Sequence, residues 1–145
     1  MYSRRRQLWA ILLPSFLDAS DLTTEEMQSL TEWTNLSEAT FVLPPEFAGA
    51  DYRVRIFCPG RELPFAGHPT LGTCHAWLEA CGEQSGEFVV QECGAGLVRN
   101  SRRTTSVLAF TAPPLLRSGP LEEDILDQTV RGLGTFRSAA GCAAR

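Results

Sequence analysis

The 145-residue sequence predicts an α+β fold of a single domain, in which one helix is enclosed by the rest of the protein. Two observations carry this prediction. Residues 51–58 alternate between apolar and polar side chains, which is the pattern of a half-buried β-strand. Residues 69–81 begin with Pro69, end before Gly82 and are apolar around nearly the whole circumference, which is typical of a helix surrounded by protein.

A second helix is predicted over residues 24–34. Thr23 and Glu26 form a capping box, in which each side chain satisfies a backbone amide at the helix start. Met27, Leu30 and Trp33 recur at helical spacing, so we expect these three side chains to form one buried face.

Strands account for most of the remaining sequence. Residues 35–38 turn the chain into a β-branched and aromatic strand over 39–43, and residues 62–66 are extended. We expect further strands over 87–91, 96–99 and 107–111, followed by a short amphipathic helix over 122–131.

Composition narrows the classes of function. The net charge of −4 argues against a nucleic-acid partner, because phosphate neutralisation requires a basic surface. Five cysteines without a C-x-x-C pair argue against a disulfide scaffold and a structural zinc site, so we expect unbridged, mostly buried thiols in a reducing cytoplasm. Residues 1–14 fit either a buried strand or a secretory signal, and their apolar run is too short to cross a membrane.

The start of the apolar helix suits an anionic ligand. A helix start leaves backbone amides without intrahelical partners and carries partial positive charge. Gly67 allows close approach of the backbone, while His68 and Thr70 add side-chain donors, so the segment could hold a carboxylate or phosphate. The alternative is that Gly67 and Pro69 only punctuate the helix and that His68 is a hydrogen-bonded core residue.

Glu38 is the candidate acid/base residue. It stands between a loop and an apolar strand, where a carboxylate can accept a proton from a carbon beside a carbonyl or carboxylate group and return it. The alternative is a solvated loop glutamate. A metal site is not expected, because His68 and His75 lie two helical turns apart, and His75 is interpreted as a core or supporting histidine.

Four segments carry a resemblance to a known family: residues 35–41, 52–57, 62–73 and 91–97. In this order and spacing they resemble the N-terminal half of the PhzF-like phenazine-biosynthesis isomerases, over roughly residues 22–132. The resemblance implies one half of a diaminopimelate-epimerase-like fold, with a mixed sheet curled around a central apolar helix. In that family the active site lies in the cleft between two such halves.

The resemblance also implies roles for the candidate residues. The glutamate matching Glu38 shuttles a proton across a small cyclic carboxylic acid, and the residues matching Gly67 and His68 hold that acid. No cofactor or metal takes part, and family members commonly form homodimers. Ala66 stands where relatives with a two-thiol mechanism carry a cysteine, so that mechanism is not expected here.

We therefore expect residues 1–145 to form a single N-terminal half-domain with a divergent start over 1–21 and a divergent tail over 133–145. No segment matches the Asp-Pro-Ala-Thr-Gly-Ser-like motif of the family's second half. Two hypotheses follow. The chain is an isomerase of the PhzF type, or it is a truncated and catalytically silent fragment that at most binds a small acid or a partner chain.

Overall fold

The computed structural model describes residues 13–81, 86–104, 107–115 and 118–132. The chain divides into two compact units, residues 1–113 and residues 114–145. The first unit contains every described strand and two helices, and the second contains helix α3 (Glu123–Gly132). The interpretations of residues 1–12 and of the tail over 133–145 lie outside the described residues.

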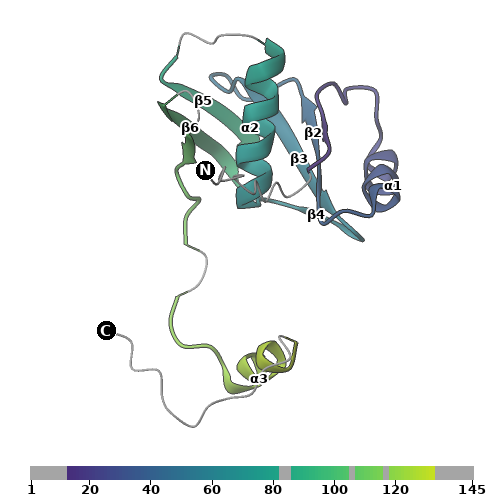
Figure 1. Ribbon diagram of the computed structural model, residues 1–145, viewed down its shortest axis with the longest axis vertical. Helices are drawn as coiled ribbons and strands as arrows, with labels where there is room; N and C mark the ends of the chain where they lie inside the picture. Colours follow the sequence, from purple (N-terminus) through teal and green to yellow (C-terminus); the bar gives the residue numbers. More distant parts are fainter. Residues whose placement is uncertain (1–12, 82–85, 105–106, 116–117, 133–145) are drawn as a thin grey trace, which may run out of the picture. The chain divides into compact units, whose positions relative to one another are not determined.

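The first unit is built on one mixed sheet, shown behind α2 in Figure 1. Its strands follow the order β1 (Ser15–Phe16), β2 (Ala39–Leu43), β3 (Tyr52–Cys58), β5 (Phe88–Cys93), β6 (Gly96–Thr104) and β7 (Val107–Phe110). A short strand, β4 (Arg61–Leu63), pairs with β3 outside this order. The β1–β2 and β3–β5 pairs are parallel and the others are antiparallel. The predicted strands are confirmed.

One edge of β3 is shared by two partners, and this arrangement guides the chain toward α2. β4 pairs with residues 56–58, while β5 pairs with residues 52–53. The turn between β5 and β6 then packs against Pro64: the Ala95 N–H donates to the Pro64 carbonyl at 3.0 Å. A Cβ atom on Gly94 would lie 2.8 Å from the Pro64 Cα, so only glycine fits this close approach. The segment preceding α2 is thereby held against the sheet.

Helix α2 (Gly67–Cys81) covers one face of the sheet and closes the larger core. Side chains at alternate positions of β3 point toward it, and the Tyr52 ring lies 5.1 Å from the Trp77 ring. Buried residues of this core come from α2 and four strands: Val42, Tyr52, Val54, Ile56, Cys74, Val89, Cys93 and Val98. The expected α+β fold, with a mixed sheet packed on a central apolar helix, is confirmed.

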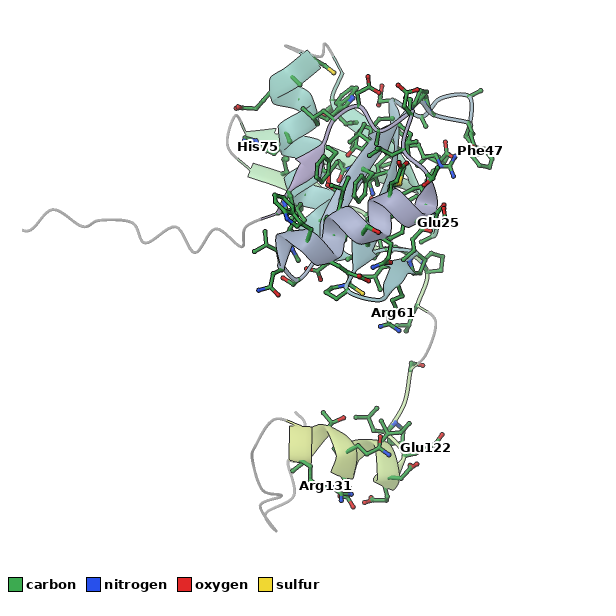
Figure 2. All side chains as sticks on the ribbon, turned by 90° about the vertical axis from the view of Figure 1, so that its right-hand side faces the viewer. Glu25, Phe47, Arg61, His75, Glu122 and Arg131 are labelled. Carbon is green, nitrogen blue, oxygen red and sulfur yellow. The ribbon has the colours of Figure 1, made fainter. Side chains whose placement is uncertain are left out.

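The expectation that α2 is enclosed on all sides is wrong for this structure. His75, Glu79, Ala80 and Cys81 are exposed, and Figure 2 labels His75 on this helix. The interpretation of His75 as a core histidine is therefore also wrong. Small apolar residues such as alanine are tolerated at protein surfaces, so an apolar composition alone overstated the burial.

The start of α2 also differs from the prediction. The first intrahelical bond runs from the Thr70 N–H to the Ala66 carbonyl at 3.1 Å, so the helix begins at Gly67 and not at Pro69. Pro69 occupies the third helical position. Its missing N–H is tolerated there because the amides of the first turn have no intrahelical acceptor.

Helix α1 (Thr24–Thr34) packs on the opposite face of the sheet, over β3, and its capping box is present as predicted. Met27 is buried beside Phe41 and Phe57 in a second, smaller core. Trp33 is 82% exposed, which corrects the predicted buried face. Six residues at 3.6 per turn place Trp33 about 120° around the helix from Met27, and the small Thr31 takes the buried position instead.

The second unit is described by itself. Its helix α3 matches the amphipathic helix predicted over 122–131 to within one residue, and Glu123 and Asp124 lie in its first turn. Among the described residues, no helix has the length and apolar content needed to cross a membrane.

Candidate active site

Glu38 and His68 come together although thirty residues separate them in the sequence. The Oε2 atom of Glu38 lies 3.4 Å from the Nε2 atom of His68. The glutamate side chain is 19% exposed and the histidine side chain 34% exposed, so the pair reaches the surface while its facing atoms are covered. The structure thus brings together two residues that local sequence chemistry proposes separately and that the family resemblance assigns to one site.

Local structure delivers each partner to this point. Glu38 follows the end of α1, where Asn35 turns the chain through a left-handed conformation with φ of 53°. It immediately precedes β2, whose first two residues are fully buried. His68 is the second residue of α2. The carboxylate therefore projects from the start of a strand and the imidazole from the start of a helix.

A buried chain of hydroxyl groups connects these two elements. The Thr73 hydroxyl on α2 donates to the Thr40 hydroxyl on β2 at 2.8 Å, and Thr40 in turn donates to the Ser15 hydroxyl on β1 at 2.9 Å. Thr40 and Thr73 are both fully buried. These hydrogen bonds between hydroxyl groups hold the start of β2 against α2 next to the Glu38–His68 pair.

The facing atoms of the pair have no hydrogen-bond partner. Glu38 Oε2 and His68 Nε2 are both buried, and neither makes a hydrogen bond. Buried polar atoms in proteins are nearly always hydrogen-bonded, and an exception calls for an explanation such as a catalytic role, a bound ion or a bound water. A carboxylate facing an imidazole can exchange one proton with it or with a bound ligand.

Gly67 lets the backbone at the start of α2 pack closely on an aromatic side chain. A Cβ atom on this residue would lie 3.4 Å from the Phe110 ring, and that ring packs edge-on against Phe65 at 5.5 Å between centroids. The amides of Gly67 and His68 precede the first intrahelical bond, so they are available to an acceptor at the helix start. Amides at a helix start suit an anionic ligand.

Thr70 is placed differently from the other candidate residues. It is fully buried, and its hydroxyl accepts a hydrogen bond from Gln91 Nε2 at 3.2 Å on the sheet side of α2. The structure does not bring it to the facing atoms of Glu38 and His68. Its predicted contact with substrate stays a prediction.

Sequence reasoning missed Gln91, which links Thr70 to the sheet. Gln91 is fully buried on β5, and its Oε1 atom accepts a hydrogen bond from the Tyr52 hydroxyl at 3.0 Å. Burial raises the pKa of Tyr52 far above its ordinary value, which keeps the phenol protonated as a donor. A polar residue at an inward position of a strand was the available signal, because such a residue needs buried partners.

A second histidine–carboxylate pair on α2 provides a contrast. His75 Nε2 lies 3.9 Å from Glu79 Oε1 one helical turn away, and both side chains are about 70% exposed: 70% for His75 and 73% for Glu79. A pair of this kind on the surface is a solvated contact of little energetic consequence. Among the described residues, no three His, Cys, Asp or Glu side chains gather in a way that would hold a metal ion.

Comparison with known proteins identifies the family. The model of the phenazine biosynthesis-like protein family, PhzC-PhzF, matches residues 14–120. The chain belongs to this family. The match includes Glu38, Gly67 and His68, and it ends before α3.

Individual relatives agree with this assignment. The chain is 53% identical over 85 residues to antisense-enhancing sequence 1 of Schizosaccharomyces pombe, which covers 57% of this chain and 28% of that protein. It is 45% identical over 94 residues to the trans-2,3-dihydro-3-hydroxyanthranilate isomerase of Pseudomonas chlororaphis, covering 65% and 33%. The chain thus spans about a third or less of the relatives' length.

Solved structures show the same fold. A PhzF-family protein of Bacillus anthracis superimposes with a TM-score of 0.56 and 37% identity, covering 61% of this chain and 29% of that one. A predicted epimerase of Pseudomonas aeruginosa gives a TM-score of 0.54 and 33% identity, covering 66% and 34%. The expected epimerase-like half-fold is confirmed.

Proposed function

We propose that the Glu38–His68 pair carries out acid/base chemistry on a small cyclic carboxylic acid and needs no cofactor. The observation that supports this is the 3.4 Å approach of two buried atoms that lack hydrogen-bond partners. The similarity to trans-2,3-dihydro-3-hydroxyanthranilate isomerases supplies the class of substrate.

The proposed reaction is a proton shift within one molecule. The Glu38 carboxylate removes a proton from a ring carbon, the ring double bond moves, and the same carboxyl group returns the proton to a second carbon. One C–H bond breaks and one forms, so no oxidant or reductant is required. His68 and the amides of Gly67 and His68 hold the carboxylate of the substrate at the positive end of α2.

A second candidate is binding of the small acid, or of a partner chain, without turnover. Among the described residues, Glu38 is the one carboxylate that faces His68, so the site offers a single proton-transfer carboxylate. If turnover requires further groups, the start of α2 would still bind the anion.

Binding of a carboxylate probe tests the part that both candidates share. We expect benzoate to shift the amide resonances of Gly67 and His68 in a saturable way. His68→Leu should weaken binding about tenfold because a donor to a charged group is lost. His75→Leu is the matched control, since it removes an exposed imidazole from the same helix, and it should bind as the wild type does. Flat amide shifts at millimolar benzoate would contradict the proposal.

A further inference from the structure

The first turn of α2 rests on the sheet at two points. The Gly67 backbone lies against the Phe110 ring, and the Thr70 hydroxyl accepts the hydrogen bond from Gln91. Gly67 and Thr70 are three residues apart, so they occupy the same side of the helix. Both contacts therefore act on the turn that presents His68.

Gln91 is held in one orientation by its own partner. The Tyr52 hydroxyl donates to Gln91 Oε1, which leaves Gln91 Nε2 to donate to Thr70. Tyr52 is fixed in turn by its ring contact with Trp77, in the third turn of the same helix. The chain of contacts thus starts and ends on α2 and passes through β3 and β5.

This series of contacts cannot serve as a proton relay, because the buried phenol of Tyr52 stays protonated and an amide does not titrate in the physiological range. Gln91 and Tyr52 are fully buried or nearly so, so their side chains do not reach a ligand directly. What remains is a mechanical role. A hydrogen bond in the core fixes how far the helix start stands from the sheet.

We propose that Gln91 is a positioning residue, which acts through Thr70 to set the place of the Gly67 and His68 amides and of the His68 imidazole. The proposal rests on the proposed function, because the positioned groups are those that hold the substrate carboxylate. It gives Thr70 the role of an anchor on the sheet side of α2, where its hydroxyl is observed.

The first test measures benzoate binding in three forms of the full chain. Gln91→Leu removes both hydrogen bonds and is expected to weaken benzoate binding about tenfold. Thr31→Val is the matched control: Thr31 is also fully buried and hydrogen-bonded, but it lies on α1 against the opposite face of the sheet. It should bind benzoate as the wild type does, although it loses stability.

A conservative change separates positioning from packing. In the Thr70→Val background, the Gln91→Leu change should add less than a further twofold loss, because its route to the helix start is already broken. Thr70→Ser retains the hydroxyl and should restore binding to within about threefold of the wild type. If Gln91→Leu fails to fold, Tyr52→Phe removes the distal hydroxyl alone and should weaken binding about threefold.

A measurement without ligand keeps the outcomes distinct. Hydrogen exchange of the Thr70 amide reports its bond to the Ala66 carbonyl, and Gln91→Leu should speed this exchange about tenfold relative to the amides of β3. If wild type binds benzoate and Gln91→Leu binds equally well, the positioning role is wrong and the proposed function stands. If wild type does not bind, the proposed function fails. Unchanged exchange at Thr70 would then overturn the positioning role as well.

Discussion

The hydroxyl of Thr73 donates to the hydroxyl of Thr40 at 2.8 Å inside the core. Thr40 follows Glu38 by two residues on β2, and Thr73 follows His68 by five on α2. This single contact therefore joins the strand that begins beside the carboxylate to the helix that begins beside the imidazole. The distance between Glu38 and His68 therefore depends on the Thr73–Thr40 hydrogen bond as well as on the two side chains.

Loss of the Thr73–Thr40 hydrogen bond should lower the free energy of unfolding. Thr73→Val removes the donor and leaves the Thr40 hydroxyl with one partner fewer, so we expect a loss of about 1 kcal/mol in the free energy of unfolding. Urea unfolding measures it. Thr24→Val is the control, because the Thr24 hydroxyl makes an exposed contact with Arg55 and should change stability by less than about 0.5 kcal/mol. Equal losses in the two variants would show that the buried position confers no special energy.

Asn100 offers the opposite experiment, in which removal of a polar group should stabilise the fold. Both polar atoms of its side chain are buried without hydrogen-bond partners, on the face of β6 that carries Val98. Asn100→Val fills the site with an apolar, β-branched side chain, and we expect a gain of about 1 kcal/mol. Gln91→Leu, which deletes an amide with partners, should instead lose stability. A loss in Asn100→Val would mean that the Asn100 amide has a partner in solution, such as a bound water.

Gly94 should not tolerate a methyl group. Its Cβ would approach the backbone Cα of Pro64 to 2.8 Å, and backbone cannot move aside as a side chain can. We expect Gly94→Ala to lower the free energy of unfolding by about 1–3 kcal/mol. Gly132→Ala, where nothing lies within 4 Å, is the comparison and should be neutral. Thermal unfolding of both variants decides the matter, and a neutral Gly94→Ala would contradict the close approach to Pro64.

The protonation of Tyr52 predicts how stability depends on alkaline pH. Burial raises the pKa of Tyr52 above its ordinary value of 10.0, so the unfolded chain loses the phenolic proton at a lower pH than the folded chain. The stabilisation is therefore complete below the unfolded pKa. Above it, stability falls by about 1.4 kcal/mol per pH unit until the folded pKa is reached. Tyr52→Phe should flatten this slope, and an unchanged slope would assign the effect to other groups.

Local features of the fold could be predicted from the sequence because their causes lie within a few residues. The capping box of Thr23 and Glu26 uses side chains three positions apart, and the alternation along β3 needs no knowledge of its neighbours. Trp33 shows the limit. Helical spacing indicates which residues share a face, but the buried stripe of α1 is narrow. Met27 and Thr31 form this stripe, and Trp33 lies outside it.

The site depended on contacts between distant segments, which a single sequence does not display. Glu38 and His68 could each be proposed from local chemistry, and the resemblance to the family paired them, but only the fold shows their atoms facing each other. Gln91, Thr40 and Thr73 were missed because polar residues on strands and helices look like surface positions until the partner segment is known. Their burial is decided by tertiary packing.

Deuterium exchange tests the central claim, that Glu38 moves a proton on a small cyclic acid held by His68. The chain is incubated in D₂O with trans-2,3-dihydro-3-hydroxyanthranilate, and deuterium in the ring is followed by NMR. We expect the wild-type chain to exchange deuterium faster than the protein-free rate. Glu38→Gln should lower the exchange rate at least about a hundredfold, because a general base is lost. Glu79→Gln, which removes an exposed carboxylate of α2, should leave the exchange rate unchanged. Exchange that is absent from the wild-type chain, or equal in both variants, would contradict the account.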